Sequence, residues 1–434
     1  MSENRMSNHS GHTKLESVRA AEKKLLLNTY ERNPVLLVGG SGVHVRDEQG
    51  NDYLDLLSGI GVNALGYAHP AVTAAIAAQS ARLLHTSNLF FHEHTVELAL
   101  RLTEISGLDR AFFCNSGTEA WEAALKLARA HAGVLRAEGK SIGTRFLAME
   151  QSFHGRTMGA VATTHKEKYR EPFAPVMPGV DFVRFNEVAD LRAKFSSDIC
   201  GICIEAIQGE GGIRPVSQEF FAAARELCDS TGALLLADEI QSGLGRTGRW
   251  FAYQHYGILP DITTLAKPIA NGLPMGAMLC TDEAARAFTP GMHGTTFGGG
   301  PLACAVAIAV IDTIKQGSVL AHICDVGGYF YEQLESLRRR HDCVTEVRGM
   351  GLMLGLELDS VDLATRAASE MMARHIIINR TSETVLRFLP PYILERNHVD
   401  TAIAALDGIL ANLTSTTLAA LAGSAPAGDH SHGQ

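Results

Sequence analysis

The stretch Arg110-Ala-Phe-Phe-Cys-Asn115 and the Ser116-Gly-Thr-Glu119 that follows it decide the fold class of this chain. The first six residues form an apolar, strand-like run, and a helical pattern extends from the second stretch to about Leu135. Ser116 and Glu119 have the spacing of a capping box, in which two side chains satisfy free N–H groups at a helix start. The stretch therefore predicts a strand, a tight turn and a long helix, which is the repeating unit of α/β proteins.

The same alternation continues along the chain. Further apolar strands are predicted at 145–149, 199–207, 233–237 and 262–265, with helical patterns between them. This order predicts a mostly parallel sheet that is covered by helices on both faces. From about Gly317 onward, helices and strands alternate in a pattern typical of a smaller α+β domain.

Length and composition exclude several classes of protein. The 434 residues predict two or three domains, and 46% hydrophobic with 20% charged residues is typical of globular chains. The formal charge of −9 disfavours nucleic acid as a partner. The longest apolar run, Leu302 to Ile311, is shorter than a membrane span, and no secretory signal precedes the first domain. We expect a soluble cytoplasmic protein.

The eight cysteines are too few for a disulfide scaffold in a chain of this length. Cys200 and Cys203 have C-x-x-C spacing, but they lie in a strand-like run that directs their side chains to opposite faces. Because no second Cys or His pair follows at zinc-site spacing, we predict reduced thiols and no metal site.

Two strand ends carry charged residues that suggest a cofactor. An apolar strand ends in Asp238, and a second strand ends in Ala266 followed by Lys267. Open α/β sheets bind ligands at the carboxyl ends of their strands, and a lysine in apolar surroundings can act as a nucleophilic amine. Taken singly, a turn cap and a surface lysine are the plainer interpretations. Together the two residues match pyridoxal 5'-phosphate (PLP), which needs a lysine for its Schiff base and an acid beside its ring nitrogen.

A phosphate site and a ring-holding segment complete this hypothesis. Ser116-Gly117-Thr118 opens the capped helix, where free N–H groups and the helix dipole attract an anion. Phe153 offers an aromatic face, and Arg156 can bind a carboxylate through two parallel hydrogen bonds. An ordinary turn, a core Phe and a surface Arg are the alternatives for each feature alone.

Over roughly residues 25–413 the sequence resembles the class III (ω-amino acid) aminotransferases of PLP fold type I. The resemblance implies a large domain with a mostly parallel, seven-stranded sheet covered by helices, and a smaller α+β domain built from both chain ends. The motifs that carry it are Val62-Asn-Ala-Leu-Gly-Tyr-Ala-His-Pro70, His85-Thr-Ser-Asn-Leu-Phe90, Phe112-Phe-Cys-Asn-Ser-Gly-Thr-Glu-Ala120, Phe153-His-Gly-Arg156, Glu205-Ala-Ile-Gln-Gly-Glu-Gly-Gly212, Asp238-Glu-Ile-Gln241, Ala266-Lys267 and His293-Gly-Thr-Thr-Phe-Gly-Gly-Gly-Pro301.

The resemblance implies a division of the chain into domains. Residues 15–72 and 317–413 would form the small domain, and residues 73–316 would form the large PLP-binding domain. Residues 1–14 and 414–434 are polar or lack a periodic apolar pattern, and we expect both tails to be disordered.

The resemblance also implies roles at the cofactor. Lys267 would carry the Schiff base and then move the proton, while Asp238 would pair with the ring nitrogen and Gln241 would bond the ring hydroxyl. The remaining cofactor contacts would come from Gly117 and Thr118 at the phosphate, from Phe153 stacked on the ring, and from Thr296 reaching the phosphate across a subunit interface. A residue shared in this way implies a homodimer with two shared sites.

Substrate contacts are implied in the same way. Arg156 would bind the substrate carboxylate and Thr295 would contact the acyl-ornithine. Glu205 would pair with Arg387 and mask it until glutamate or 2-oxoglutarate arrives.

Within the family, residues 85–90 and 293–301 look more like the branch that acts on N-acetyl-L-ornithine. That enzyme moves the distal amino group to 2-oxoglutarate, giving N-acetyl-L-glutamate 5-semialdehyde and glutamate in arginine biosynthesis. Ile60 stands where ornithine δ-aminotransferases have tyrosine, and Gly300 stands where many relatives have asparagine. Succinylornithine, succinyl-diaminopimelate, 4-aminobutyrate and ornithine are alternative donors.

Other classes of function are less consistent with the sequence. Gly243-Leu-Gly-Arg-Thr-Gly248 matches the G-x-G-x-x-G fingerprint of an NAD-dependent oxidoreductase, but the preceding strand ends too early and no helix start follows. His92-Glu-His94 with His85 lacks the histidine pair of a zinc hydrolase helix. A non-catalytic relative would have no need to keep Lys267, Asp238, Arg156 and Thr296 together.

Overall fold

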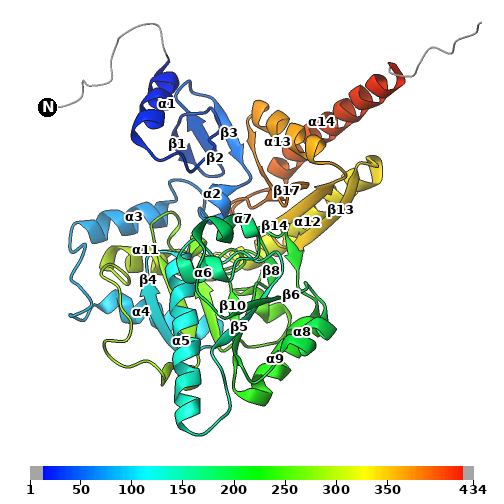
Figure 1. Cartoon of the computed structure of the whole chain (residues 1–434). Coiled ribbons are helices and arrows are strands. Elements are labelled where there is room, and N and C mark those ends of the chain that lie inside the picture. The colour runs from blue at the N-terminus through cyan, green and yellow to red at the C-terminus, as the bar shows by residue number, and fades with distance from the viewer. Residues whose placement is uncertain (1–12, 424–434) are drawn as a thin grey trace, which may run out of the picture.

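The computed structural model describes residues 13–423, which form an α/β body and, above it in Figure 1, a smaller body of sheets and helices. The predicted tails are described only in part, because residues 1–12 and 424–434 lie outside the described residues. The described part differs from the prediction at both ends. Helix α1 (Lys14–Leu25) begins directly after its N-cap Thr13. Helix α14 (Arg396–Gly423) continues past the predicted end at residue 413.

The larger body is built on a seven-stranded sheet, as predicted from the resemblance. All neighbouring strands are parallel except at β12, which is antiparallel to both of its neighbours. Strands β6 and β12 were not predicted. The strand order is β4 (Arg110–Cys114), β12 (Gly276–Cys280), β11 (Ile262–Leu265), β10 (Leu234–Asp238), β7 (Ile199–Ile204), β5 (Arg145–Met149) and β6 (Val180–Val183).

Helix α5 (Gly117–Ala137) covers one face of this sheet and confirms the strand–turn–helix prediction. The Ser116 side chain accepts a hydrogen bond from the Glu119 backbone, and the Glu119 carboxylate accepts one from the Asn115 backbone at 2.7 Å. The helix buries an apolar face that includes Trp121, and burial of each large side chain contributes about 1.5–3 kcal/mol. The other helices of this body are α3 (Pro70–Ser80), α4 (Glu93–Ser106), α8 (Val188–Lys194), α9 (Gln218–Thr231) and α11 (Pro301–Gln316).

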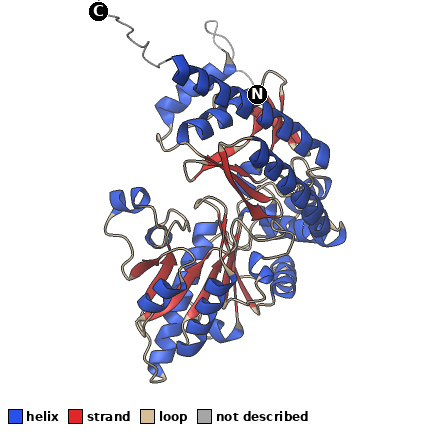
Figure 2. Cartoon of the chain, turned by 90° about the vertical axis from the view of Figure 1, so that its right-hand side faces the viewer, coloured by secondary structure: helices blue, strands red, loops and turns tan. Residues whose placement is uncertain are grey.

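The smaller body joins the two ends of the chain (Figure 2). Strand β15 (Ile376–Ile377) pairs in parallel with β3 (Asp52–Asp55), so a C-terminal strand completes an N-terminal sheet. The first small sheet also contains β1 (Leu37–Ser41) and β2 (His44–Asp47), and the second has the order β13 (Val344–Met350), β14 (Met353–Leu358), β17 (Val385–Phe388) and β16 (Asn379–Thr381). Helices α12 (Val319–Arg340), α13 (Val361–Ala373) and α14 pack around them.

Short elements connect these layers. They are α2 (Ser58–Gly61), α6 (Met158–Ala162), α7 (Glu167–Arg170), α10 (Asp282–Ala285), β8 (Ile207–Gln208), β9 (Arg214–Pro215) and the 3-10 helices η1 (Glu171–Phe173), η2 (Ala252–His255) and η3 (Lys267–Ala270). No single helix of residues 13–423 is long and apolar enough to cross a membrane; α11 and α12 meet such a test only as a pair, and the chain bends by 70° between them.

Candidate active site

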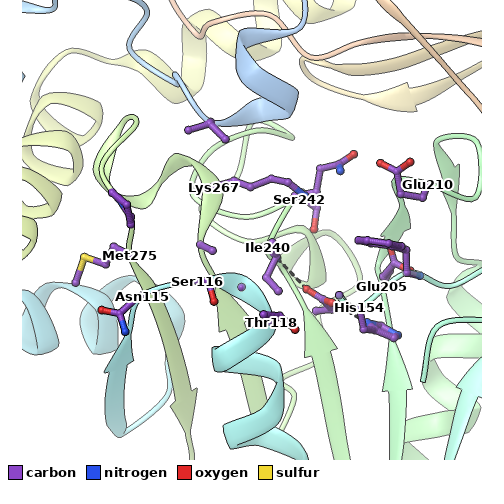
Figure 3. Close-up of a pocket in the computed structure, with 18 of the residues that line it drawn as sticks. Asn115, Ser116, Thr118, His154, Glu205, Glu210, Ile240, Ser242, Lys267 and Met275 are labelled. Atoms are coloured by element: carbon purple, nitrogen blue, oxygen red, sulfur yellow. Dashed lines mark hydrogen bonds and ion pairs between the residues drawn. The ribbon is translucent and has the colours of Figure 1, made fainter. Parts of the chain in front are cut away.

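A cavity of about 340 Å³ lies at the carboxyl ends of the central strands. Its walls come from the β4–α5 turn, the ends of β10 and β11, the loop after β5, the segment after β7, the loop before β12 and one N-terminal residue, Val62. In Figure 3, Lys267 extends across the upper part of the cavity, with Ser116 and Thr118 below it and Glu205 and Glu210 to its right. The strand order therefore brings together residues that are far apart in the sequence.

Asp238 is the last residue of β10 and is buried. Its Oδ1 accepts a hydrogen bond from the Ile240 backbone N–H at 3.0 Å, and its Oδ2 lies 2.7 Å from His154 Nδ1. The His154 ring in turn stacks on Trp121, with ring centroids 4.1 Å apart and planes 6° from parallel. These contacts hold the carboxylate in one orientation toward the cavity.

His154 is a site residue that the sequence analysis did not assign. It lies within the Phe153-His-Gly-Arg156 motif, so the motif marked the segment but not the role of the histidine. The sequence alone could not show that this histidine lies beside Asp238, because the two residues are 84 positions apart.

Lys267 opens the 3-10 helix η3 directly after β11, and Pro268 follows it. Burial lowers the pKa of the Lys267 amine from its ordinary value, although the charge of Glu210 opposes this shift. A lowered pKa increases the fraction of neutral amine, which is the nucleophilic form. Lys267 is thus suited to form a Schiff base with an aldehyde.

The end of the cavity that suits a phosphate group is formed by the start of α5. Ser116, Gly117 and Thr118 line it, and the free N–H groups of a 21-residue helix point there. A Cβ atom at Gly117 would lie 2.9 Å from Cδ1 of Ile240, so only glycine fits without a shift. The Thr118 hydroxyl lies 2.7 Å from the hydroxyl of Thr157.

These residues fit PLP. The cavity offers a buried lysine with a lowered pKa, a carboxylate held by a histidine, and a glycine-containing helix N-terminus for an anion. The three features correspond to the aldehyde, the ring nitrogen and the phosphate of that cofactor.

Arg387 does not pair with Glu205, contrary to the prediction. Its Nη1 lies 2.5 Å from Glu210 Oε1, and its Nε donates to Asn379 Oδ1 at 3.0 Å. Gln241 also lines the cavity, and its Oε1 accepts from Arg387 Nη1 at 3.4 Å. The two glutamates lie five positions apart in one motif, and sequence spacing could not show which of them faces the arginine.

Glu205 instead braces two backbone segments of the site. Its two oxygens accept hydrogen bonds from the N–H groups of Phe153 at 2.9 Å and Gly209 at 3.1 Å. Burial raises the pKa of Glu205 to about 7. For Glu210, burial acts to raise the pKa, but the charge of Arg387 and its hydrogen bond lower it below the ordinary value.

Most predicted cofactor residues line the cavity, but four predicted site residues do not: Arg387, which reaches it through Glu210 and Gln241, and Arg156, Thr295 and Thr296. The lining includes Lys267, Asp238, Gly117, Thr118, Phe153, Gln241 and Glu205. Arg156 is exposed, with its Cζ 3.9 Å from the centre of the Tyr169 ring. Thr295 accepts a hydrogen bond from Asn115 Nδ2 at 3.2 Å beside the helix start, and Thr296 lines a separate small cavity with His85 and Phe297.

The turn that carries Ile60 is left-handed throughout. Ser58, Gly59, Ile60 and Gly61 have φ values of 48°, 68°, 67° and 78°. A β-branched residue at positive φ is strained, and such strain persists where the surroundings hold it. Asp55 accepts hydrogen bonds from the Leu57 and Ser58 backbones, and the Ser58 hydroxyl donates to Leu389 O at 2.6 Å.

The sequence features behind the rival functions have other roles in the structure. His92 is the N-cap of α4, where its side chain accepts from the His94 backbone. Within residues 13–423, no group of three His, Cys, Asp or Glu side chains could hold a metal ion. The Gly243–Gly248 segment forms turns rather than a helix start after β10.

Comparisons with known proteins agree with this geometry. The aminotransferase class-III family matches residues 27–410 of the chain. The chain is 45% identical over 395 residues to an acetylornithine aminotransferase of Methanocaldococcus jannaschii, which covers 90% of this chain and 97% of the relative. Among solved structures, an ornithine aminotransferase from Toxoplasma gondii superposes with a TM-score of 0.88 at 30% identity, covering 93% of this chain and 97% of that one. A PLP-bound amine transaminase from an uncultivated Pseudomonas species has a TM-score of 0.84 at 28% identity, covering 90% and 99%.

Proposed function

The chain belongs to the class III aminotransferases, which are PLP-dependent transaminases, and from this premise we propose that its amino donor is N-acetyl-L-ornithine. The distal amino group would pass to 2-oxoglutarate, giving N-acetyl-L-glutamate 5-semialdehyde and glutamate, as a step of arginine biosynthesis. The observation that carries this proposal is the 45% identity, over nearly the whole chain, to a relative named for that donor. Ile60 also supports it, because ornithine δ-aminotransferases have a tyrosine at this position and this chain does not.

Lys267 and Asp238 carry the proposed chemistry. Bound PLP supplies an electron sink for the carbon that loses its proton. Lys267 would hold the cofactor and then, once its amine is free, move a proton at the donor carbon. Asp238, oriented by His154, would hold the ring nitrogen in its protonated form.

The Glu210–Arg387 pair would let one cavity accept two unlike substrates. An acylated ornithine presents a neutral amide where glutamate presents a second carboxylate. If Arg387 had no carboxylate partner, binding the neutral amide beside it would be unfavourable, because the charge of the arginine would lose its water without gaining a counter-charge. We infer that Glu210 neutralises Arg387 while the donor is bound and releases it to the carboxylate of 2-oxoglutarate or glutamate. Arg156 would bind the carboxylate common to both substrates.

The proposed assembly is a homodimer in the cytoplasm. The segment from Leu89 to Phe91 is exposed, with relative accessibilities of 87% for Leu89, 71% for Phe90 and 104% for Phe91. A large exposed apolar patch is typical of a protein interface. Phe297, beside Thr296, is also 65% exposed, so a second copy that covers this surface could bring Thr296 to the phosphate site.

The proposed compartment is supported by the cysteines. All eight cysteines are unpaired, which is consistent with a reducing compartment.

Absorption spectroscopy of the purified holoprotein tests the proposed donor. Candidate amines are added one at a time, and loss of the lysine-bound PLP band reports the first half of the reaction. We expect N-acetyl-L-ornithine and glutamate to convert the band rapidly, with ornithine and 4-aminobutyrate far slower. If any other amine in the panel converts the band faster than these two, the family assignment stands and the proposed donor is wrong. Succinylornithine and succinyl-diaminopimelate belong in the same panel.

A further inference from the structure

The Gly243–Gly248 segment carries a buried arginine that the proposed reaction does not use. Arg246 lies in the loop after β10 and is 0% exposed. Within the described residues, no carboxylate lies within ion-pair distance of it. Burial of an arginine without a carboxylate is costly, so a chain that retains one gains something from its geometry.

The guanidinium of Arg246 contacts the C-terminal part of the smaller body. Its Nη1 donates to Leu352 O at 3.2 Å and to Pro390 O at 2.5 Å. The backbone carbonyl of Arg246 accepts from Leu352 N at 3.0 Å, and its Cζ lies 4.6 Å from the centre of the Tyr392 ring. A single side chain therefore joins the loop of the larger body to two segments of the smaller one.

The glycines around Arg246 permit this close approach. Gly245 and Gly248 have φ values of +101° and +86°, and a Cβ atom at Gly248 would lie 2.4 Å from Cys324 Sγ. Gly351, at φ +56°, would place a Cβ atom 2.8 Å from the carbonyl oxygen of Arg246. The motif that suggests a nucleotide fingerprint in the sequence thus forms a tight joint between the two bodies.

Three of the segments at this joint continue into the site. Gln241 lies on the same loop as Arg246, and Arg387 precedes Pro390 by three residues. The N-terminal turn also reaches the joint, because a Cβ atom at Gly61 would lie 3.9 Å from Arg246 Nη2 and Val62 lines the cavity.

We propose that Arg246 is a positioning residue that sets where Arg387 stands against Glu210 and Gln241. By anchoring the carbonyl of Pro390, it fixes the end of β17 relative to the loop that carries Gln241. The affinity of the site for the second carboxylate of glutamate and 2-oxoglutarate would then depend on a residue that touches neither substrate. The identity of this dicarboxylate rests on the proposed function.

Two variants of the holoenzyme test the proposal. R246M keeps the length of the side chain and removes every donor, whereas R246K keeps the charge and loses the planar fork. Rapid mixing follows the bound-PLP absorption with L-glutamate in one series and N-acetyl-L-ornithine in the other. In R246M we expect the concentration of glutamate that gives half-maximal conversion to rise at least tenfold. The value for N-acetyl-L-ornithine should change less than threefold, and R246K should lie between wild type and R246M.

R225M is the matched control, because Arg225 is a partly buried arginine of α9 that pairs with Asp261 and Asp229 away from the cavity. It should lower the melting temperature without changing either half-maximal concentration. The effect of R246M on glutamate should also vanish when it is added to R387K, because both act through one guanidinium.

Equal rises for both substrates, no rise for glutamate, or additive effects in the double variant would overturn the proposal. If R246M does not fold, the same comparison in R246K decides. If wild type is converted by glutamate but not by N-acetyl-L-ornithine, the proposed donor fails, and the glutamate series still tests Arg246. If glutamate does not convert wild type either, both proposals fail.

Discussion

The floor of the cavity and its outer rim are built in opposite ways. On the floor, Asp238 and Lys267 end strands of the large sheet, and Asp238 is buried with hydrogen-bond partners in the same chain. The surface that we call the rim lies outside this cavity: Phe91 and Phe297 are exposed there, and Thr296 lines a separate small cavity. The difference teaches that one chain can assemble the reacting groups, whereas its exposed aromatic surface stays uncovered; in the proposed homodimer a second copy would cover this surface and bring Thr296 to the phosphate.

The largest effect is expected at the floor, from K267A. Removal of the amine leaves no group to hold the cofactor covalently or to move the proton, so transamination should fall at least about 10⁴-fold. Absorption of the lysine-bound cofactor should disappear while the melting temperature stays close to that of wild type. K315A, which removes a surface lysine paired with Glu104, is the control and should retain full activity. Residual turnover above about 1% in K267A would place the chemistry elsewhere.

D238N tests whether Asp238 acts through the charge of its carboxylate as well as through its shape. The amide cannot pair with a protonated ring nitrogen as a carboxylate does, and we expect a loss of roughly 10²–10⁴-fold in kcat. H154Q should cost less, because it removes the group that orients Asp238 rather than the carboxylate itself. Steady-state kinetics at saturating PLP separate the two, and a larger loss in H154Q than in D238N would reverse these assignments.

The Glu210–Arg387 pair should separate the two substrates. R387M would remove the proposed partner of the second carboxylate, so KM for 2-oxoglutarate should rise roughly 100-fold. KM for the amine donor should change little, because that substrate has a neutral group at this place. Steady-state assays that vary one substrate at a time give both values. A parallel rise for donor and acceptor would show that the arginine does not discriminate between them.

At the rim, T296A should have a modest effect. Loss of one hydrogen bond to the phosphate costs about 0.5–1.5 kcal/mol, which weakens PLP binding roughly 2- to 13-fold. Equilibrium dialysis of PLP against the apoprotein measures this. T401A, on the outer face of α14, is the control and should leave PLP binding unchanged. T163A could not serve, because the Thr163 hydroxyl bonds the buried side chain of Trp121. No change in PLP affinity would remove Thr296 from the site.

The last effect is on the stability of the floor rather than on turnover. Burial raises the pKa of Glu205 in the folded protein to about 7 from 4.5, so the folded state binds more protons than the unfolded state between these values. The contribution of Glu205 to the free energy of unfolding is therefore complete below about pH 4.5 and is lost as the pH rises through 7, by up to about 3 kcal/mol. E205Q should flatten the pH dependence of apoprotein melting in this range. E283Q, at an exposed surface pair, should leave it unchanged.

The same contrast explains what the sequence could predict. Strand ends, the capped start of α5 and the positions of Asp238 and Lys267 follow from local patterns, and the structure gathers them in one cavity. The contacts that depend on the direction of a side chain could not be predicted from these local patterns. The choice of Glu210 rather than Glu205 for Arg387, the bond from His154 to Asp238, and the joint at Arg246 all arise where segments far apart in the sequence meet. Strands β6 and β12 were missed because their short apolar runs lack a distinctive period.

Mixing two inactive variants tests most directly whether floor and rim come from different copies. K267A lacks the lysine, and T296D places a negative charge where the phosphate is expected. In a mixed dimer, the intact Thr296 of the K267A chain would complete the site that holds the Lys267 of the other chain. Refolding the two variants together should restore about a quarter of wild-type activity, because half of the dimers are mixed and each has one complete site. Activity that stays at the level of the separate variants would contradict a site shared between subunits.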